Sequence, residues 1–253
     1  MGVKKSVSNK DNKKPKSEKK TKQTEQTNHL SYIPKAIGLN DKQNEFIKGI
    51  EEKDITIGIG ASGVGKTYVT LLQAFNLLKA SDKLDKIVLV KSVTVVKGEE
   101  IGFLKGSQEE KMEPFMYSYS GNINKIFKDT EASNKLLESG IVQWLPLSYI
   151  RGVNIDNAII IVDESQNLTV DLFKTIITRL GMNSKIIFLG DTEQIDRHNK
   201  KESCLVNICD MFSNSDLVNI VKFNDDECIR NPIIPKILNI LNEYETIINY
   251  TKK

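Results

Sequence analysis

Gly60-Ala61-Ser62-Gly63-Val64-Gly65-Lys66-Thr67 is the stretch that decides the fold of this chain. It matches the complete pattern G-x-x-x-x-G-K-[ST] of a phosphate-binding loop. Residues 55–59 before it are rich in β-branched side chains, as in a buried strand, and residues 67–80 after it carry apolar side chains at helical spacing. A glycine-rich turn between a strand and a helix is the simpler interpretation. The agreement of all eight positions and of both flanks favours the phosphate loop.

The residues of this loop are predicted to bind a nucleotide together. Glycines let backbone N–H groups turn toward a phosphate, and the helix that follows points its positive end at the same anion. Lys66 is predicted to neutralise the β- and γ-phosphates, and the Thr67 hydroxyl to bind Mg²⁺. We therefore expect ATP and magnesium as cofactors, with residues 60–67 as the nucleotide-binding segment.

A second apolar run ends in two acidic residues. Residues 158–162 are Ala-Ile-Ile-Ile-Val, typical of a fully buried strand, and Asp163 and Glu164 follow at its carboxyl end. Beside a phosphate loop, Asp163 is predicted to hold the water shell of the metal, and Glu164 to polarise the attacking water. A solvated turn is the alternative interpretation of two adjacent acids. The combination with the loop favours the catalytic one.

Strands and helices alternate along the rest of the chain. Apolar runs predict four further strands, at 87–90, 141–145, 185–189 and 217–221. Helical spacing predicts a short helix after Asn40 or Asp41 and longer ones over 170–180 and 234–248. Residues 107–138 are expected to be mostly helical, with Gly121 as an interruption. This alternation predicts an α/β fold, a doubly wound and mostly parallel sheet with helices on both faces.

Two glutamines are candidates for the same site. Gln43 precedes the loop on the short helix, and its amide offers a donor and an acceptor together, which suits the paired edge of adenine. A solvent-facing helical glutamine is the alternative for this residue. Gln194 lies three residues after Asp191, which follows the predicted strand 185–189. We expect Gln194 to sense the γ-phosphate and to pass its state to a bound polymer.

Charge and composition separate a tail from a globular part. The net charge of +3 is uneven, because the first 27 residues contain nine lysines and three acids, a net charge of +6 that leaves −3 for the rest. Such a segment has too few apolar side chains to offset the entropy cost of ordering. We expect residues 1–32 to be a disordered tail and residues 33–253 to form a single domain, with the helical stretch 107–138 as an insertion.

The lysine-rich tail has several candidate roles besides that of a solubilising segment. Its lysine runs suit non-specific binding to nucleic-acid phosphates and also resemble a nuclear localisation patch. Residues 1–6, Met-Gly-Val-Lys-Lys-Ser, fit the short pattern for myristoylation.

The sequence favours a cytoplasmic protein with no membrane partner. No apolar run approaches the length of about 20 residues that crosses a bilayer, and the N-terminus lacks the apolar stretch of a signal peptide. Three cysteines without C-x-x-C spacing and two histidines argue against a zinc site. We interpret the cysteines as reduced and partly buried side chains.

These stretches together resemble the PhoH family of single-domain P-loop ATPases, whose core is similar to the first motor domain of superfamily 1 helicases. The resemblance runs from about Leu39 to Ile240. Besides the loop it rests on Gly98-Glu99-Glu100-Ile101-Gly102-Phe103-Leu104-Lys105-Gly106, Pro146-Leu147-Ser148-Tyr149-Ile150-Arg151-Gly152, Asp163-Glu164-Ser165-Gln166-Asn167, Gly190-Asp191-Thr192-Glu193-Gln194 and Arg230-Asn231-Pro232.

The resemblance implies a RecA-like sheet in which the strand that ends at Gly190 lies between the loop strand and the Asp163 strand, close enough for Gln194 to approach the γ-phosphate. Gln43 falls where helicase-like relatives place an adenine-reading glutamine. The sequence departs from the family pattern at Ser165, where alanine is usual, and at Lys91, where arginine is frequent. The lysine at position 91 weakens the expectation of a bidentate phosphate contact there.

The resemblance also implies a missing partner for the site. Two-domain helicases complete the ATP site with an arginine from the second domain, and we expect the residues after Lys222 to be too few for such a domain. We therefore expect a ring, such as a hexamer, or another head-to-tail homo-oligomer that supplies the arginine from a neighbour. The chain has 36 basic residues but only four arginines. Arg230 is the first candidate for this catalytic finger and Arg179 the second, and a structural ion pair is the alternative for either.

Three functions are compatible with these features. The first is a magnesium-dependent ATPase coupled to RNA or single-stranded DNA, with residues 91–97 and the tail touching the strand. The second is a slow nucleotide-dependent switch for binding or assembly. The third is a small-molecule kinase, against which the stretch 190–194 argues because it resembles the coupling element of a motor. The predicted catalytic residues are Lys66, Glu164, Gln194 and Arg230.

Overall fold

The computed structural model describes residues 30, 33–91, 108–192 and 204–224, and six positions further along, 233, 236, 237, 240, 241 and 244; for 108–115 it describes the backbone only. Within these residues six strands form one sheet in which every neighbouring pair is parallel. The strands are β1 (Ile55–Ile59), β2 (Lys86–Lys91), β3 (Val142–Trp144), β4 (Ala158–Asp163), β5 (Lys185–Gly190) and β6 (Val218–Lys222). Their order across the sheet is β3-β2-β4-β5-β1-β6.

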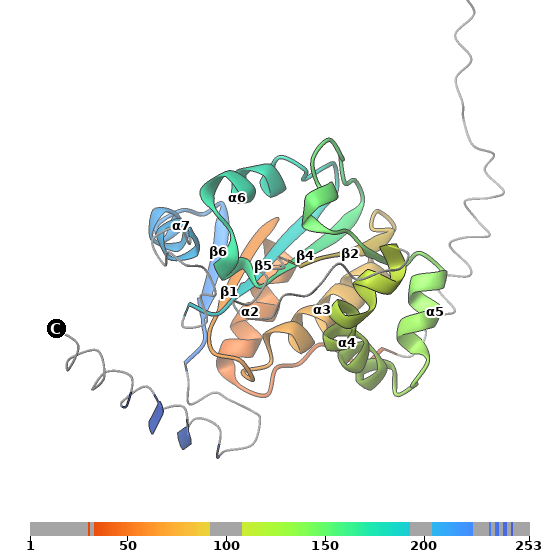
Figure 1. Cartoon of the computed structure of the whole chain (residues 1–253), viewed down its shortest axis with the longest axis horizontal. Helices are drawn as coiled ribbons and strands as arrows, with labels where there is room; N and C mark the ends of the chain where they lie inside the picture. The colour runs from red at the N-terminus through yellow and green to blue at the C-terminus, as the bar shows by residue number, and fades with distance from the viewer. Residues whose placement is uncertain are drawn as a thin grey trace, which may run out of the picture.

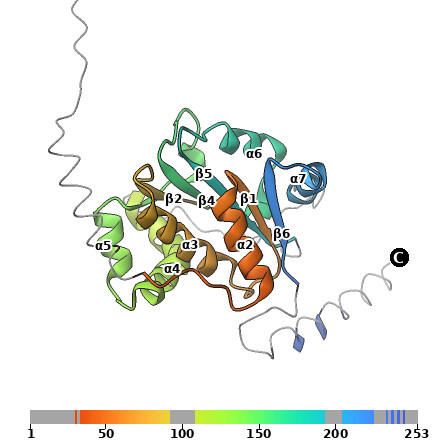
Figure 2. The same cartoon turned by 180° about the vertical axis from the view of Figure 1, so that it is seen from behind.

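Helices cover both faces of this sheet. Figures 1 and 2 show α2 (Asp41–Glu52), α3 (Lys66–Ala80), α4 (Gln108–Phe127) and α5 (Ala132–Glu138) on one face. The other face carries α6 (Val170–Ile177) and α7 (Leu205–Phe212). Two short 3-10 turns, η1 (Leu147–Tyr149) and η2 (Ser165–Asn167), follow β3 and β4. This is the predicted doubly wound α/β organisation of a P-loop NTPase.

Alternation along the strands supplies both cores. In β4, Ile159 and Ile161 pack in the cluster under α2, α3, α4 and α5, whereas Ile160 and Val162 pack in the cluster under α6 and α7. A strand that is buried on both faces needs apolar residues at every position, because successive side chains point to opposite faces. The continuous apolar run in the sequence therefore indicates a central strand, and β4 lies between β2 and β5.

Most predicted elements are present, with shifts of a few residues at their ends. The strand that ends at Gly190 lies between β1 and β4, as the family resemblance implied. Leu30, which the sequence placed in the disordered tail, is buried in the core, at 3% exposure. Of the predicted helix over 234–248, the described positions are helical and exposed, among them Ile237 and Ile240. Its other residues and the rest of the tail lie outside the described residues.

One prediction about helices was wrong, and one helix was missed. Gly121 does not interrupt the stretch 107–138, since it lies inside α4, and the break falls instead between Phe127 and Ala132, where Lys128 adopts a φ of 54°. Helix α7 was not predicted at all.

Within the described part of the chain, no helix is both long enough and apolar enough to span a bilayer.

The close contact between β1 and α2 explains why β1 contains a glycine, Gly58. A Cβ atom at Gly58 would lie 2.7 Å from Cζ of Phe46. Phe46 is fully buried and packs edge-on against Phe223, with ring centroids 5.5 Å apart, so its ring has no room to move away.

Replacing Gly58 by alanine is therefore expected to lower the free energy of unfolding by about 1–3 kcal/mol, because overpacking forces the buried ring or the strand to shift. Gly121→Ala is the matched control. A Cβ at Gly121 meets nothing within 4 Å, so removing a helical glycine should raise stability by about 0.5–1 kcal/mol. Urea unfolding followed by circular dichroism measures both. A Gly58→Ala protein as stable as the parent would contradict the packing argument.

Candidate active site

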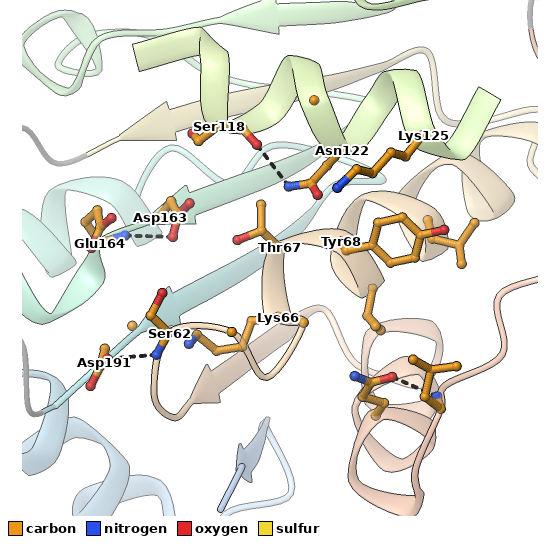
Figure 3. Close-up of a pocket in the computed structure, with 18 of the residues that line it drawn as sticks. Ser62, Lys66, Thr67, Tyr68, Ser118, Asn122, Lys125, Asp163, Glu164 and Asp191 are labelled. Carbon is orange, nitrogen blue, oxygen red and sulfur yellow. Dashed lines mark hydrogen bonds between the residues drawn. The ribbon is translucent and has the colours of Figure 1, made fainter. Parts of the chain in front are cut away.

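The predicted site residues meet at the edge of the sheet where the strands β1, β4 and β5 end. A cavity of about 870 Å³ lies there, between the loop after β1 and helix α4 (Figure 3). Its lining includes Lys66 and Thr67 on one side, and Asp163 and Glu164 at the end of β4. Parallel strands bring their carboxyl ends to one edge, which is where ligands bind in open α/β sheets. The structure thus brings eight of the predicted residues together in one cavity: Gln43, Ser62, Gly63, Gly65, Lys66, Thr67, Asp163 and Glu164.

The loop over residues 60–67 has the backbone of a phosphate cradle. Gly63 and Gly65 have φ values of 101° and 87°, which side chains rarely allow. Gly65 is the N-cap of α3 and makes no side-chain cap hydrogen bond, and the N-terminal end of a helix attracts anions. Lys66 donates from Nζ to the carbonyl oxygens of Gly60 (2.6 Å) and Ala61 (2.9 Å). Its ammonium group is therefore folded back onto the loop.

Two polar side chains from elsewhere in the chain hold this loop. Asp191, directly after β5, accepts a hydrogen bond from the backbone N–H of Ser62 through Oδ2, at 3.1 Å. Gln43 of α2 donates from Nε2 to the carbonyl oxygen of Val64 at 2.9 Å, and its Oε1 accepts from the N–H of Leu39 at 2.8 Å. Both residues are buried, at 7% and 1% exposure. The loop is tied to β5 and α2 as well as to its own strand.

The position of Gln43 bears on its predicted contact with adenine. Gln43 lines the cavity, but both ends of its amide already bond to the backbone. A carboxamide has a second lone pair and a second N–H, so these contacts leave chemical capacity for a base edge. What the structure adds is a second role, because Gln43 fixes the segment before α2 to the phosphate loop.

The acidic pair at the end of β4 is constrained by its hydrogen bonds and backbone. Asp163 accepts hydrogen bonds through Oδ1 from the N–H of Glu164 and through Oδ2 from the hydroxyl of Tyr119, each at 3.0 Å. Burial raises the pKa of Asp163 above its ordinary value, and the neighbouring charge of Glu164 raises it further. Glu164 itself has a φ of 54°, in the left-handed region that is uncommon for non-glycine residues.

Lys91 and Gln166 contact the carboxylate of Glu164. The ammonium group of Lys91, at the end of β2, lies 3.8 Å from Oε1. The side-chain amide of Gln166 donates to Oε2 at 2.8 Å. The sequence alone assigned no role at the site to Gln166 or Asp191. They meet only because β4 and β5 are neighbours in the sheet, which the local sequence does not show.

Helix α4 forms a wall of the cavity that the sequence did not predict. Ser118, Asn122 and Lys125 recur at helical spacing and point toward the phosphate loop (Figure 3). The adjacent positions Tyr119 and Ile123 are buried beneath the helix. The alternation of apolar and polar positions indicates an amphipathic helix, but the sequence alone did not show that its polar side faces the phosphate loop. The stretch expected as an insertion thus contributes directly to the site.

Among the candidates that the structure describes, Gly60, Ala61, Val64 and Arg179 do not line the cavity. Gln194 and Arg230 lie outside the described residues. Arg179 lies at the opposite end of the sheet, before β5 begins, where it donates to the carbonyl oxygen of Val153 and to the hydroxyl of Thr178. It does not approach the cavity of its own chain.

Solved structures share parts of this fold at low identity. The large terminase of a thermophilic bacteriophage is 12% identical, with a TM-score of 0.46, and the match covers 76% of this chain and 47% of that one. The UvsW helicase of bacteriophage T4 is 13% identical, with a TM-score of 0.45 and coverage of 79% and 67%. With TM-scores below 0.5, these likenesses carry no weight for the function of this chain.

The relatives in sequence are more informative. The chain is 33% identical over 196 residues to the PhoH-like protein of Bacillus subtilis (strain 168), a match that covers 78% of this chain and 60% of that protein. It is 31% identical over 201 residues to Protein PhoH of Escherichia coli (strain K12), with coverage of 79% and 56%. The chain spans less than two thirds of the length of these relatives. Residues 36–242 match the family described as PhoH-like protein, and the chain therefore belongs to the PhoH-like family.

Proposed function

We propose that this chain hydrolyses ATP in a magnesium-dependent reaction that RNA or single-stranded DNA stimulates. The observation that carries the proposal is the single cavity that joins the loop residues Lys66 and Thr67 to the acidic pair Asp163 and Glu164. A phosphate cradle and an acidic strand end on one cavity are the parts that phosphoryl transfer to water requires. Membership of the PhoH-like family supports the same conclusion.

The residues present fit a magnesium nucleotide. Magnesium in nucleotide sites takes one or two protein oxygens and completes its shell with phosphate oxygens and water, and Thr67 and Asp163 would supply these oxygens. When bound, the metal would neutralise charge on the phosphates. Lys66 would exchange its loop carbonyl partners for phosphate oxygens, and Glu164 would accept a proton from the attacking water.

Coupling to nucleic acid is supported by the chain's lysines. Lys91 ends β2 beside Glu164, and it leads into residues 92–97, which we expect to touch the strand and which lie outside the described residues. The tail carries a net charge of +6 over its first 27 residues, and such segments bind phosphates without sequence preference.

A slow nucleotide-dependent switch is the second candidate. Among the described residues that line the cavity the cations are lysines, Lys35, Lys66, Lys91 and Lys125, and none is an arginine. Arginine supplies a planar fork that lysine does not, and an arginine finger is worth about 10³–10⁵ in turnover in nucleotide hydrolases. A chain acting alone with this lining would turn over slowly. In the ATPase proposal, a homo-oligomer supplies Arg230 or Arg179 from a neighbour.

Turnover measurements separate the two functions. We expect the full chain to hydrolyse ATP with magnesium, and RNA or single-stranded DNA to accelerate it both in the full chain and in a chain that begins at Asn28, which keeps the buried Leu30. Lys66→Ala should abolish nucleotide binding. Glu164→Gln should retain binding but lose about 10²–10⁴ in turnover, the usual contribution of a general base. Slow turnover without stimulation in both chains would favour the switch, and undiminished binding by Lys66→Ala would refute the loop assignment.

The burial of the Asp163 carboxylate predicts a stability effect with a definite sign. Because its pKa is raised in the folded chain, the ionised carboxylate destabilises the fold at neutral pH, and this penalty disappears as the pH falls toward the ordinary value of 3.8. Asparagine keeps the shape and can still bond to Glu164 N–H and to Tyr119. Without magnesium, Asp163→Asn should be more stable than the parent at pH 8, and the difference should shrink at pH 5. Urea unfolding at both values measures this. A variant that is less stable at pH 8 would contradict the argument.

A mixing experiment tests the arginine from a neighbour. Glu164→Gln subunits and Arg230→Ala subunits should each be inactive alone. In a one-to-one mixture, roughly a quarter of the head-to-tail neighbours combine an intact Glu164 with an intact Arg230, so ATP turnover should partly recover. The same mixture with Arg179→Ala tests the second candidate. Mixed assemblies that form but stay inactive with both arginine variants would exclude either as the finger.

A further inference from the structure

We propose that Gln166 is a positioning residue for Glu164, and that it connects the orientation of the Glu164 carboxylate to the phosphate loop through Asp191. This inference rests on the proposed function, in which Glu164 is the general base. It assigns a role to a buried side chain that bridges the turn after β4 and the end of β5. Gln166 acts through its hydrogen-bond partners on these two elements.

The backbone determines which way the amide of Gln166 points. Its Oε1 accepts a hydrogen bond from the N–H of Asp191 at 3.1 Å. A backbone N–H can only donate, so an oxygen must face Asp191, and the NH₂ group must then face the other way. There it donates to Oε2 of Glu164 at 2.8 Å. The orientation of the amide is thus imposed from the β5 side and leaves Glu164 with a donor.

The turn after β4 holds Gln166 in place. Glu164 enters the turn with a left-handed backbone, and η2 begins at the next residue. The hydroxyl of Ser165 donates to the carbonyl oxygen of Leu189 in β5, which ties the turn to that strand. The fit is close at Gly190, where a Cβ would lie 3.2 Å from the backbone nitrogen of Gln166. Gln166 itself is 1% exposed, so its side chain has little freedom.

A continuous path of hydrogen bonds follows from these contacts. The N–H of Ser62 in the phosphate loop donates to Oδ2 of Asp191. The N–H of Asp191 donates to Gln166, and Gln166 donates to Glu164. A shift of the loop that moves Asp191 therefore also moves the donor that orients the Glu164 carboxylate. The other carboxylate oxygen faces Lys91 at 3.8 Å, so the two oxygens of Glu164 have different partners.

Orientation matters because a general base must present an oxygen to the attacking water within hydrogen-bond reach. A glutamate has three rotatable side-chain bonds, and the Glu164 side chain is 39% exposed, which leaves its carboxylate access to the cavity. The Gln166 contact selects one rotamer in advance and lowers the entropy cost of reaching the reactive geometry. Supporting residues of this kind typically change activity by about 10–100-fold.

Gln166→Glu is the discriminating substitution. It keeps the size of the side chain and an oxygen to accept from Asp191, but it replaces the donor that faces Glu164 by a second carboxylate oxygen. We expect kcat to fall about 10–100-fold, while the Kd for ATP changes less than about threefold, since no phosphate contact is lost. Gln143→Glu is the matched control, because Gln143 is exposed on β3 and does not line the cavity. Its kcat should equal that of the parent.

A double-variant cycle supplies a readout that does not depend on turnover. Gln166→Glu should lower the thermal unfolding temperature by placing two carboxylates together. Glu164→Gln combined with Gln166→Glu should restore part of the loss, because the exchanged pair again has one donor and one acceptor, although the charge then lies at the buried position 166. Additive changes in unfolding temperature would overturn the proposed contact. An unchanged kcat in Gln166→Glu would overturn the positioning role even if the ATPase function stands. A parent protein without turnover would refute the proposed function, whereas the unfolding cycle would still decide the contact.

Discussion

The parallel pairing of β5 with both β1 and β4 is the constraint on which the site depends. Ile59 pairs with Gly190, and Val162 pairs with Phe188, so the three strands end at nearly the same level of the sheet. The phosphate loop and the acidic pair then lie two strand spacings apart, roughly 10 Å. β5 separates the two. The residue after β5, Asp191, lines the cavity between them and bonds to Ser62 of the phosphate loop and to Gln166 of the turn after β4.

The site is built from features that are individually unfavourable. Asp163 is buried with a raised pKa, Glu164 has a left-handed backbone, and Gln43, Gln166 and Asp191 are polar side chains almost removed from water. Buried polar groups are tolerated where their hydrogen bonds are made, and local strain persists where the surrounding structure determines it. The apolar clusters on both faces of the sheet provide that support. The register of the strands fixes where β1, β4 and β5 end, and this limits the conformations that the turns after them can adopt.

The sequence predicts a feature of this structure well where the residues that determine the feature are close together in the chain. Continuous apolar runs predicted the central strands, because burial on both faces leaves no polar positions. Gly121 was misread, because a glycine costs a helix only about 1 kcal/mol, less than the buried apolar face of α4 contributes. Helix α7 was missed although it is as long as α6, which was predicted, so its length does not explain the miss. Gln166 and Asp191 are 25 residues apart, and only the sheet order makes them neighbours.

Two lysines at the cavity already have protein partners, since Lys66 bonds to loop carbonyls and Lys91 faces Glu164. A bound triphosphate would attract Lys66 away from the loop carbonyls, which belong to the segment next to Ser62. Ser62 is the first member of the hydrogen-bonded path to Glu164. Under the proposed function, with Glu164 as the general base, filling the phosphate cradle and orienting that base would be coupled through hydrogen bonds within this chain. The proposed arginine from a neighbouring subunit would then have to stabilise charge, while the path within this chain would align the water-activating group.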